Sequence, residues 1–231
     1  MIFLQQLTVS PNAGSEAAPI IPTEDTMSIL QLFIDGGLYI MIPLLIFNIL
    51  AVYIFVERYL AIQKASKNDS TFMNNIKDFI HDGKIDAAKA LCRSTDAPSA
   101  RMIEKGISRI GKPLADISAA IENVGKLEIY KLEKTLAILA TIAGAAPMIG
   151  FLGTVIGMIF TFHEMKISGN GVEISQLSGG IMQAMITTVA GLIVGIMAYV
   201  FYNFLVSKVE KVVYKLEVTS VEFMDLLQEP A

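Results

Sequence analysis

The chain has 231 residues, of which 53% are hydrophobic and only 17% charged, with a net charge of −4 and a mean hydropathy of +0.56. Ordinary soluble domains are less apolar, so this composition excludes a fold surrounded entirely by water. The single cysteine, Cys92, excludes an internal disulfide framework, and we expect it to be a reduced structural thiol. Because the apolar residues gather in blocks, the positions of those blocks decide the class of protein.

The first 28 residues contain Pro11, Pro19 and Pro22 but no Lys or Arg. They lack the basic start and the full apolar core of a secretory signal peptide. We therefore expect residues 1–28 to form a flexible periplasmic tail.

Three long stretches without Asp, Glu, Lys or Arg follow, at residues 36–56, 135–162 and 174–207. Each exceeds the roughly 20 residues that cross about 30 Å of hydrocarbon. Buried helices of soluble proteins are shorter, and the rest of this chain is too small to enclose three of them. We predict an all-α membrane protein with transmembrane helices at 29–60, 134–163 and 175–207, the last two continuing beyond the bilayer.

The basic residues predict the orientation. All 18 Lys and Arg residues except Lys166 lie at 58–134 or 208–215. The positive-inside rule assigns these two regions to the cytoplasm. We expect a multi-pass inner-membrane protein with a periplasmic N-terminus, a periplasmic loop at 164–174 and a cytoplasmic C-terminus.

The two basic regions show helical patterns. Apolar residues such as Ile76 and Ile80 recur at helical spacing within residues 61–133, and turn signals stand at 82–83 and before Pro98. This pattern predicts a helical cytoplasmic domain. Charged and apolar residues alternate with helical period at 208–231, which predicts a cytoplasmic C-terminal helix that continues the third span.

Enzymatic chemistry has little support. The sequence contains no Walker-type phosphate loop, HExxH, CxxC pair or nucleophile elbow, and it has only two histidines. We expect no catalytic residues, no cofactor and no metal site. The mixture of acidic and basic residues, with the negative net charge, also argues against a nucleic-acid partner.

Small residues and hydroxyls line one face of each of the last two spans. Small side chains let helix backbones approach closely, and a proline can kink a helix. The candidate packing residues are Pro147, Gly150, Gly153 and Gly157 in the second span, with Gly191 and Gly195 in the third. Thr154 and Thr188 lie beside these glycines. The hydroxyl of a buried threonine often donates a hydrogen bond to a carbonyl one turn earlier in its own helix. Each threonine taken alone can therefore have a purely structural role instead of a functional one.

Gln183 places an amide side chain within the third span. An amide at membrane depth is costly unless it meets a polar partner or a water-filled lumen. Gln183 is therefore a candidate for a polar pathway, together with Thr154, Thr187 and Thr188.

The stretch from Pro147 to Phe162 resembles the Pro-x-x-Gly-x-x-Gly-Thr-Val-x-Gly-Met signature of the MotA/TolQ/ExbB proton-channel family, above all its ExbB and TolQ branch. Further similarity covers Glu57–Arg58 and residues 83–93, 98–106 and 180–203. The resemblance implies a homopentamer whose second and third spans line a pore. That pore would enclose single-span helices of an ExbD- or TolR-like partner, which carry an essential aspartate. Such assemblies use the proton-motive force to move a TonB-like protein and drive import across the outer membrane.

Carried over by position, the resemblance implies that Thr154 and Thr188 line the pore and that Glu57 and Arg58 stand at its cytoplasmic mouth. The chain has Gln183 where the branch usually has glutamate, so the charge-free stretches 135–162 and 174–207 contain no Asp, Glu, Lys, Arg or His. We expect Thr154, Gln183, Thr187 and Thr188 to orient water or the partner's carboxylate, while the partner's aspartate exchanges the proton.

Other readings stay open at this stage. Threonine hydroxyls and carbonyls can also coordinate a hard cation, which leaves a sodium-driven version possible. A TolQ-like subunit, a gliding or flagellar stator and a non-conducting membrane scaffold are further alternatives, although flagellar stators usually have four spans. His163 near the periplasmic surface is either an interfacial polar residue in contact with membrane lipid or a pH sensor.

Overall fold

The computed structural model describes residues 29–66, 70–168 and 174–228. The expected tail at 1–28 lies outside them. The described residues form α1 (Ile29–Asp35), α2 (Leu38–Ala65), α3 (Ser70–His81), α4 (Ile85–Ser94), α5 (Pro98–Ile107), α6 (Leu114–Glu133), α7 (Leu136–Ser168) and α8 (Ile174–Gln228). None of the described segments is a strand, which confirms the all-α class.

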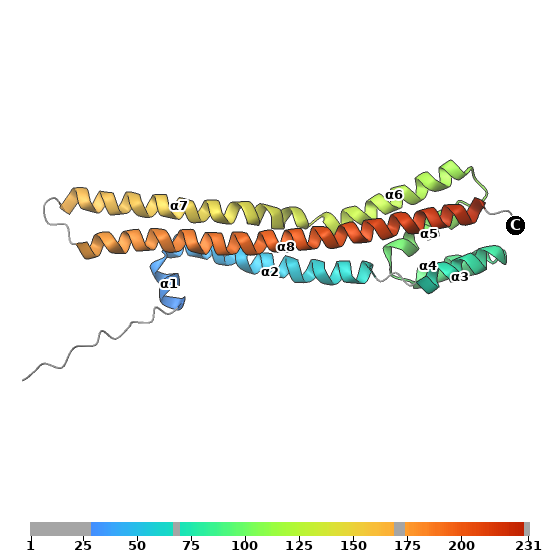
Figure 1. The fold of residues 1–231 in the computed structure, drawn as a ribbon, viewed down its shortest axis with the longest axis horizontal. Coiled ribbons are helices and arrows are strands. Elements are labelled where there is room, and N and C mark those ends of the chain that lie inside the picture. Colours follow the sequence, from blue (N-terminus) through green and yellow to red (C-terminus); the bar gives the residue numbers. More distant parts are fainter. Residues whose placement is uncertain (1–28, 67–69, 169–173, 229–231) are drawn as a thin grey trace, which may run out of the picture.

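The long helices run side by side. α7 packs against the N-terminal part of α8 over most of its length, and α2 packs along α8 as well (Figure 1). Three helical stretches, one in α2, one through α7 and one in α8, are long and apolar enough to cross a membrane, as predicted. α8 alone has 55 residues, which corresponds to a length of about 80 Å. It therefore extends well beyond the bilayer, as the sequence also predicts.

The first span differs from the single helix expected at 29–60. α1 ends where the N–H groups of Gly36 and Gly37 bond back to carbonyls within α1, and α2 begins with two N–H groups that bond the Gly37 carbonyl. Gly37 has a φ of 79°, a conformation that a residue with a Cβ adopts only at a cost. This glycine separates α1 from the span, and α2 then continues to Ala65 without interruption.

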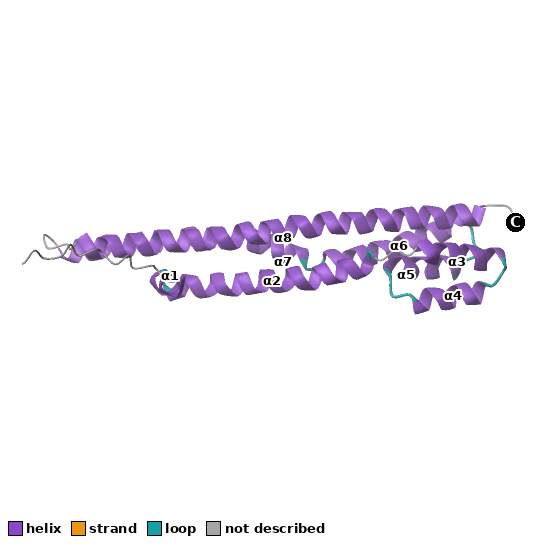
Figure 2. Cartoon of the chain, turned by 60° about the horizontal axis from the view of Figure 1, so that its bottom comes forward, coloured by secondary structure: helices purple, strands orange, loops and turns teal. Residues whose placement is uncertain are grey.

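Helices α3 to α6 and the C-terminal half of α8 form a region called here the polar end (Figure 2). There α5 and α6 pack against α8, α4 packs against α5, and α3 packs against α4. The turns anticipated from the sequence are present: Gly83, with a φ of 69°, separates α3 from α4, and Pro98 opens α5. Proline suits a first helical position because no hydrogen bond is required from its nitrogen. Ile103, Ile121 and Phe223 are fully buried and join α5, α6 and α8 into one core.

A short interruption at 134–135 separates α6 from α7. The N–H of Ile138 bonds the Thr135 carbonyl at 3.2 Å, which is the spacing of a tight turn rather than of an α-helix. α6 tilts away from α8 beyond this α6–α7 joint (Figure 1). The second predicted span and the polar end therefore meet at a bend.

Candidate functional site

The backbones of α7 and α8 touch at Gly150 and Gly191. A methyl group on Gly191 would lie 2.7 Å from the Ala146 carbonyl oxygen and 2.8 Å from the Gly150 Cα, and one on Gly150 would lie 2.8 Å from the Thr187 carbonyl oxygen. Backbone atoms cannot move aside as a flexible side chain can. The two small faces expected from the sequence therefore face each other within one chain.

The other candidate packing residues belong to the same contact. A methyl on Gly153 would lie 2.6 Å from the Thr187 hydroxyl oxygen, one on Gly157 would lie 3.0 Å from the Ala184 Cβ, and one on Gly195 would lie 2.5 Å from the Pro147 ring. Each of these pairs joins α7 to α8. The small residues thus permit a close helix pair, the usual way of stabilising association where no water drives it.

The hydroxyls of Thr154 on α7 and Thr188 on α8 are hydrogen-bonded to each other. Thr154 is also positioned to donate to the Ala184 carbonyl at 3.1 Å, and Thr188 to the Gly150 carbonyl at 3.3 Å. Each hydroxyl thus reaches a carbonyl of the opposite helix, and that carbonyl belongs to the residue one turn before the other threonine of the pair. The two hydroxyl protons face two carbonyl oxygens and the two hydroxyl oxygens, so both hydroxyls are satisfied and acceptor capacity remains.

Thr187 takes a different position. Its side chain is only 2% exposed, it packs against Gly153, and its hydroxyl donates to the Ala184 carbonyl at 2.7 Å. Thr154 and Thr188, in contrast, are partly exposed on one side of the helix pair. Of the three threonines, only the Thr154–Thr188 pair has an open side that water or another helix can reach.

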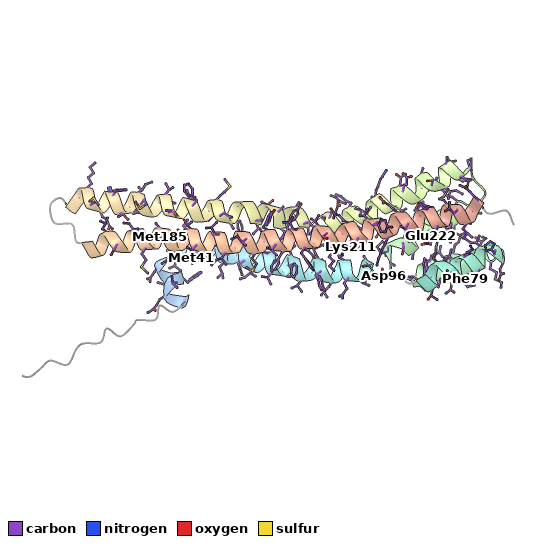
Figure 3. All side chains as sticks on the ribbon, viewed as in Figure 1. Met41, Phe79, Asp96, Met185, Lys211 and Glu222 are labelled. Atoms are coloured by element: carbon purple, nitrogen blue, oxygen red, sulfur yellow. The ribbon has the colours of Figure 1, made fainter. Side chains whose placement is uncertain are left out.

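The structure does not bring Gln183 to that pair. Its amide nitrogen lies beside the α1–α2 corner, where a methyl on Gly37 would come within 2.4 Å of it. Gln183 precedes Thr188 by five residues, which places it about 140° away around α8. Gln183 therefore faces the first span, whereas Thr188 faces away from it. Figure 3 shows Met41 and Met185 at the same corner, where α1 and α2 meet α8.

Arg58 joins α2 to the α6–α7 joint. Its guanidinium donates to both carboxylate oxygens of Glu57, at 2.8 and 3.0 Å, and to the Lys131 carbonyl at 2.8 Å. That carbonyl belongs to the last turn of α6, where carbonyls lack partners within the helix and a cation is favoured. The predicted pair thus acts in the structure as a tie between two elements.

An ion-pair network at the polar end was not anticipated. Glu128 on α6 is only 4% exposed and accepts from Arg101 at 2.7 Å and from Lys131 at 2.6 Å. Arg101 also pairs with Asp96 at 2.9 Å, and Asp96 pairs with Lys64 of α2 at 2.5 Å. The network connects α2, the α4–α5 loop, α5 and α6. In the sequence, nothing distinguishes Glu128 from the many acidic residues of this region. Its helical spacing to Lys131 indicates an ion pair but not its burial.

The electrostatics of this network favour the ionised forms. Burial by itself would raise the pKa of Glu128, but the hydrogen bonds and positive charges of Arg101 and Lys131 outweigh it and leave the pKa below its ordinary value. Hydrogen bonds from Lys64 and Arg101 lower the pKa of Asp96. Cys92 lies nearby in the polar end, where burial first and Glu104 second raise its pKa to about 12. Its thiol is therefore protonated and inert at neutral pH.

The described part of the chain holds no group of three or more His, Cys, Asp or Glu side chains that could bind a metal ion. The membrane-level segments of α7 and α8 carry hydroxyls, carbonyls and small side chains without an ionisable group. This site can accept and donate hydrogen bonds but cannot itself take up a proton near neutral pH.

These features define a multi-pass membrane protein in which two closely packed spans carry a hydroxyl pair at membrane depth. The family profile described as MotA/TolQ/ExbB proton channel family matches residues 94–218. This match covers more than half of the chain, including α7, most of α8 and the glycine and threonine contacts above. The chain belongs to this family.

Individual relatives agree with the ExbB branch. The ExbB-like 3 protein of Synechocystis is 28% identical over 169 residues, which cover 73% of this chain and 80% of the relative. The ExbB-like 1 protein of the same organism is 29% identical over 192 residues, or 82% of this chain and 75% of the relative. The biopolymer transport protein ExbB of Aquifex aeolicus is 41% identical over 96 residues, 41% of this chain and 64% of its own.

Proposed function

We propose that this chain is the channel-forming subunit of an inner-membrane motor. In this proposal it assembles as a homo-oligomer, with a pentamer as the expected state, around the single-span helices of an ExbD-like partner. The assembly couples the proton-motive force, through a TonB-like protein, to import across the outer membrane. The N-terminus and the α7–α8 loop then face the periplasm, and the polar end is cytoplasmic.

The Thr154–Thr188 pair is the observation that carries this proposal. Its hydroxyls are open on the side of α8 that faces away from the first span, the side where copies of the chain can surround a lumen. Their remaining acceptor capacity suits a water molecule or a protonated carboxyl group. Because the spans contain no acid or base of their own, a proton-carrying group has to come from the partner. Thr187, in contrast, holds α7 and α8 together in this proposal, and Gln183 is exposed and lies apart from the pair.

The test is proton flux into liposomes that contain the chain with and without its single-span partner. We expect partner-dependent flux to fall by at least about tenfold in Thr154→Val/Thr188→Val, because valine keeps the shape and removes both hydroxyls. The same loss is expected when the partner's membrane Asp is changed to Asn. Thr141→Val is the matched control, since Thr141 is exposed on α7 and bonds only its own helix at Ala137.

Three outcomes would change the proposal. Full flux after the partner's Asp→Asn change would place the proton-carrying group elsewhere. Flux that follows a sodium gradient instead of a proton gradient would establish the sodium-driven alternative. A folded complex that conducts neither ion, and that works normally with both valines in place, would identify a membrane scaffold.

A further inference from the structure

A groove of about 630 Å³ lies between the α6–α7 joint and α8, where the charge-free spans end. Its floor is apolar and includes Leu136, Val206 and Val213. Its rim carries three carboxylates, Glu133 at the end of α6 and Glu210 and Glu217 on α8. Among the described residues, no Lys or Arg lines it. The groove therefore combines an apolar floor with a wholly acidic rim.

The groove continues the face that carries the threonine pair. Leu136 precedes Thr154 by 18 residues on α7, and Val206 follows Thr188 by 18 residues on α8. Eighteen residues make about five complete turns, so both groove residues point in the same direction as the threonines, about 27 Å away along the helices. Because α7 and α8 are antiparallel, Leu136 and Val206 both lie on the polar-end side of the threonine pair (Figure 1). A helix that touches the threonine pair therefore leads directly into the groove.

The rim carboxylates are hydrated and, within the described residues, unpaired. Within the described residues, Glu133, Glu210 and Glu217 form no ion pair, although several other acids at the polar end do. All three are exposed, and two of them follow each other at two turns' distance on one helix. Carboxylates on both sides of an apolar strip are the complement of a segment with cations beside apolar side chains.

We propose that this groove binds the basic juxtamembrane segment of the single-span partner. The inference rests on the proposed function, in which that partner's helix lies against the threonine pair. A single-span helix has Lys and Arg enriched on its cytoplasmic flank. The flank emerges from the lumen at the level of the groove, so its cations meet the three glutamates and its apolar side chains meet the valines. The groove thereby fixes the height of the partner's helix, and so of its carboxyl group, relative to Thr154 and Thr188.

Two other occupants fit less well. The headgroup of an anionic phospholipid presents a phosphate without a balancing cation, which the rim carboxylates repel. A second copy of this chain would need an exposed basic strip, whereas its cations in this region, such as Lys134, Lys208 and Lys211, are interspersed with Glu133 and Glu210. Both occupants remain distinguishable by experiment.

The first test uses the full chain in nanodiscs of zwitterionic lipid and a fluorescent synthetic peptide with lysines on one helical face and leucines on the other. We expect Glu133→Gln/Glu210→Gln/Glu217→Gln to weaken peptide binding by about five- to tenfold, with a smaller salt dependence, because three exposed charge pairs are lost. A peptide with glutamates in place of the lysines is expected not to bind. Equal affinity of the wild type and the triple variant for the lysine peptide would overturn the proposal.

The matched control is Asp116→Asn/Glu222→Gln/Asp225→Asn. It removes three exposed carboxylates of the polar end that lie outside the groove. The net charge changes as in the groove variant, so a general electrostatic effect would weaken binding equally in both. Only a larger loss in the groove variant supports the proposal.

The second test identifies the occupant in the assembled complex. A photo-reactive amino acid replaces Tyr214, an exposed residue of the groove wall. Cross-links to the partner's segment support the proposal, and cross-links mainly to a second copy or to lipid overturn it. Proton flux of the same complex is measured in parallel. A conducting complex without the partner cross-link refutes only the groove, whereas a partner cross-link in a complex that conducts no ion refutes only the proposed function.

Discussion

The membrane-level part of the helix pair and the polar end are held together in opposite ways. α7 and α8 meet through glycines and hydroxyls, with backbone atoms in contact and no charged group between them. At the polar end, an apolar core joins α5, α6 and α8, and five charged side chains centred on Glu128 add a network that ties α2 to α5 and α6. Hydrocarbon penalises unpaired charge, and water weakens hydrogen bonds between neutral groups, so each region uses the contact that its surroundings favour. Changes of shape should therefore damage the first region most, and changes of charge the second.

The largest effect is expected from Gly191→Leu. Even a methyl group at this position meets the Ala146 carbonyl at 2.7 Å, so a leucine has to force α7 and α8 apart. We expect loss of the folded helix pair, or at least the roughly 1–3 kcal/mol that overpacking costs. Thermal unfolding in detergent, followed by circular dichroism, measures the change.

Gly144 provides the control on the same helix pair, because a methyl there has nothing within 4 Å. Gly144→Ala is expected to be neutral or to stabilise α7 by up to about 1 kcal/mol, since alanine favours helix. If Gly144→Ala and Gly191→Ala lowered stability equally, close backbone contact would not be what holds these helices together.

An intermediate effect is expected from Glu128→Gln at the polar end. The amide leaves Arg101 and Lys131 without their shared carboxylate, at a cost of about 1–3 kcal/mol, because both cations are partly solvated. Glu122→Gln removes only the long, exposed contact to Lys126 at 3.9 Å and should change stability by less than about 0.5 kcal/mol.

The stability lost in Glu128→Gln should also depend on pH. The pKa of Glu128 is lower in the folded state than its ordinary 4.5. Its contribution is therefore complete above that ordinary value and is lost as the pH falls toward the lowered pKa. The stability difference between the wild type and Glu128→Gln should shrink below about pH 5. A difference that stayed constant down to the acid unfolding limit would show that Glu128 acts by shape alone.

The smallest effect is expected for Cys92, a buried residue of the polar end, and it concerns the reactivity of the thiol. With its pKa raised to about 12, the thiol should react with a maleimide at neutral pH at least about a hundredfold more slowly than a surface cysteine. Ser108→Cys in a Cys92→Ala background supplies the exposed comparison. Equal labelling rates without denaturant would mean that α4 opens readily.

The sequence predicted much of this structure because hydrocarbon imposes rules that local patterns record. Charge-free stretches identified three spans, and the spacing of Gly150, Gly153 and Gly157 predicted a close helix contact. The break at Gly37 was missed because its cause, a single positive φ, leaves no periodic signal in an apolar run. The assignment of oligomeric state, partner and ion stays a prediction drawn from the resemblance.

The amino-acid sequence by itself determined the class of protein, the number of spanning helices and the small, hydroxyl-bearing faces, because each of these depends on residues close together in the chain. Only the tertiary structure decided that Thr154 pairs with Thr188, that Gln183 turns toward Gly37, and that Glu128 is buried. Arg58 and the Lys131 carbonyl that it binds are 73 residues apart. No local pattern specifies such a pair, because helices that meet far along the chain are selected by packing and by the need to satisfy buried polar groups.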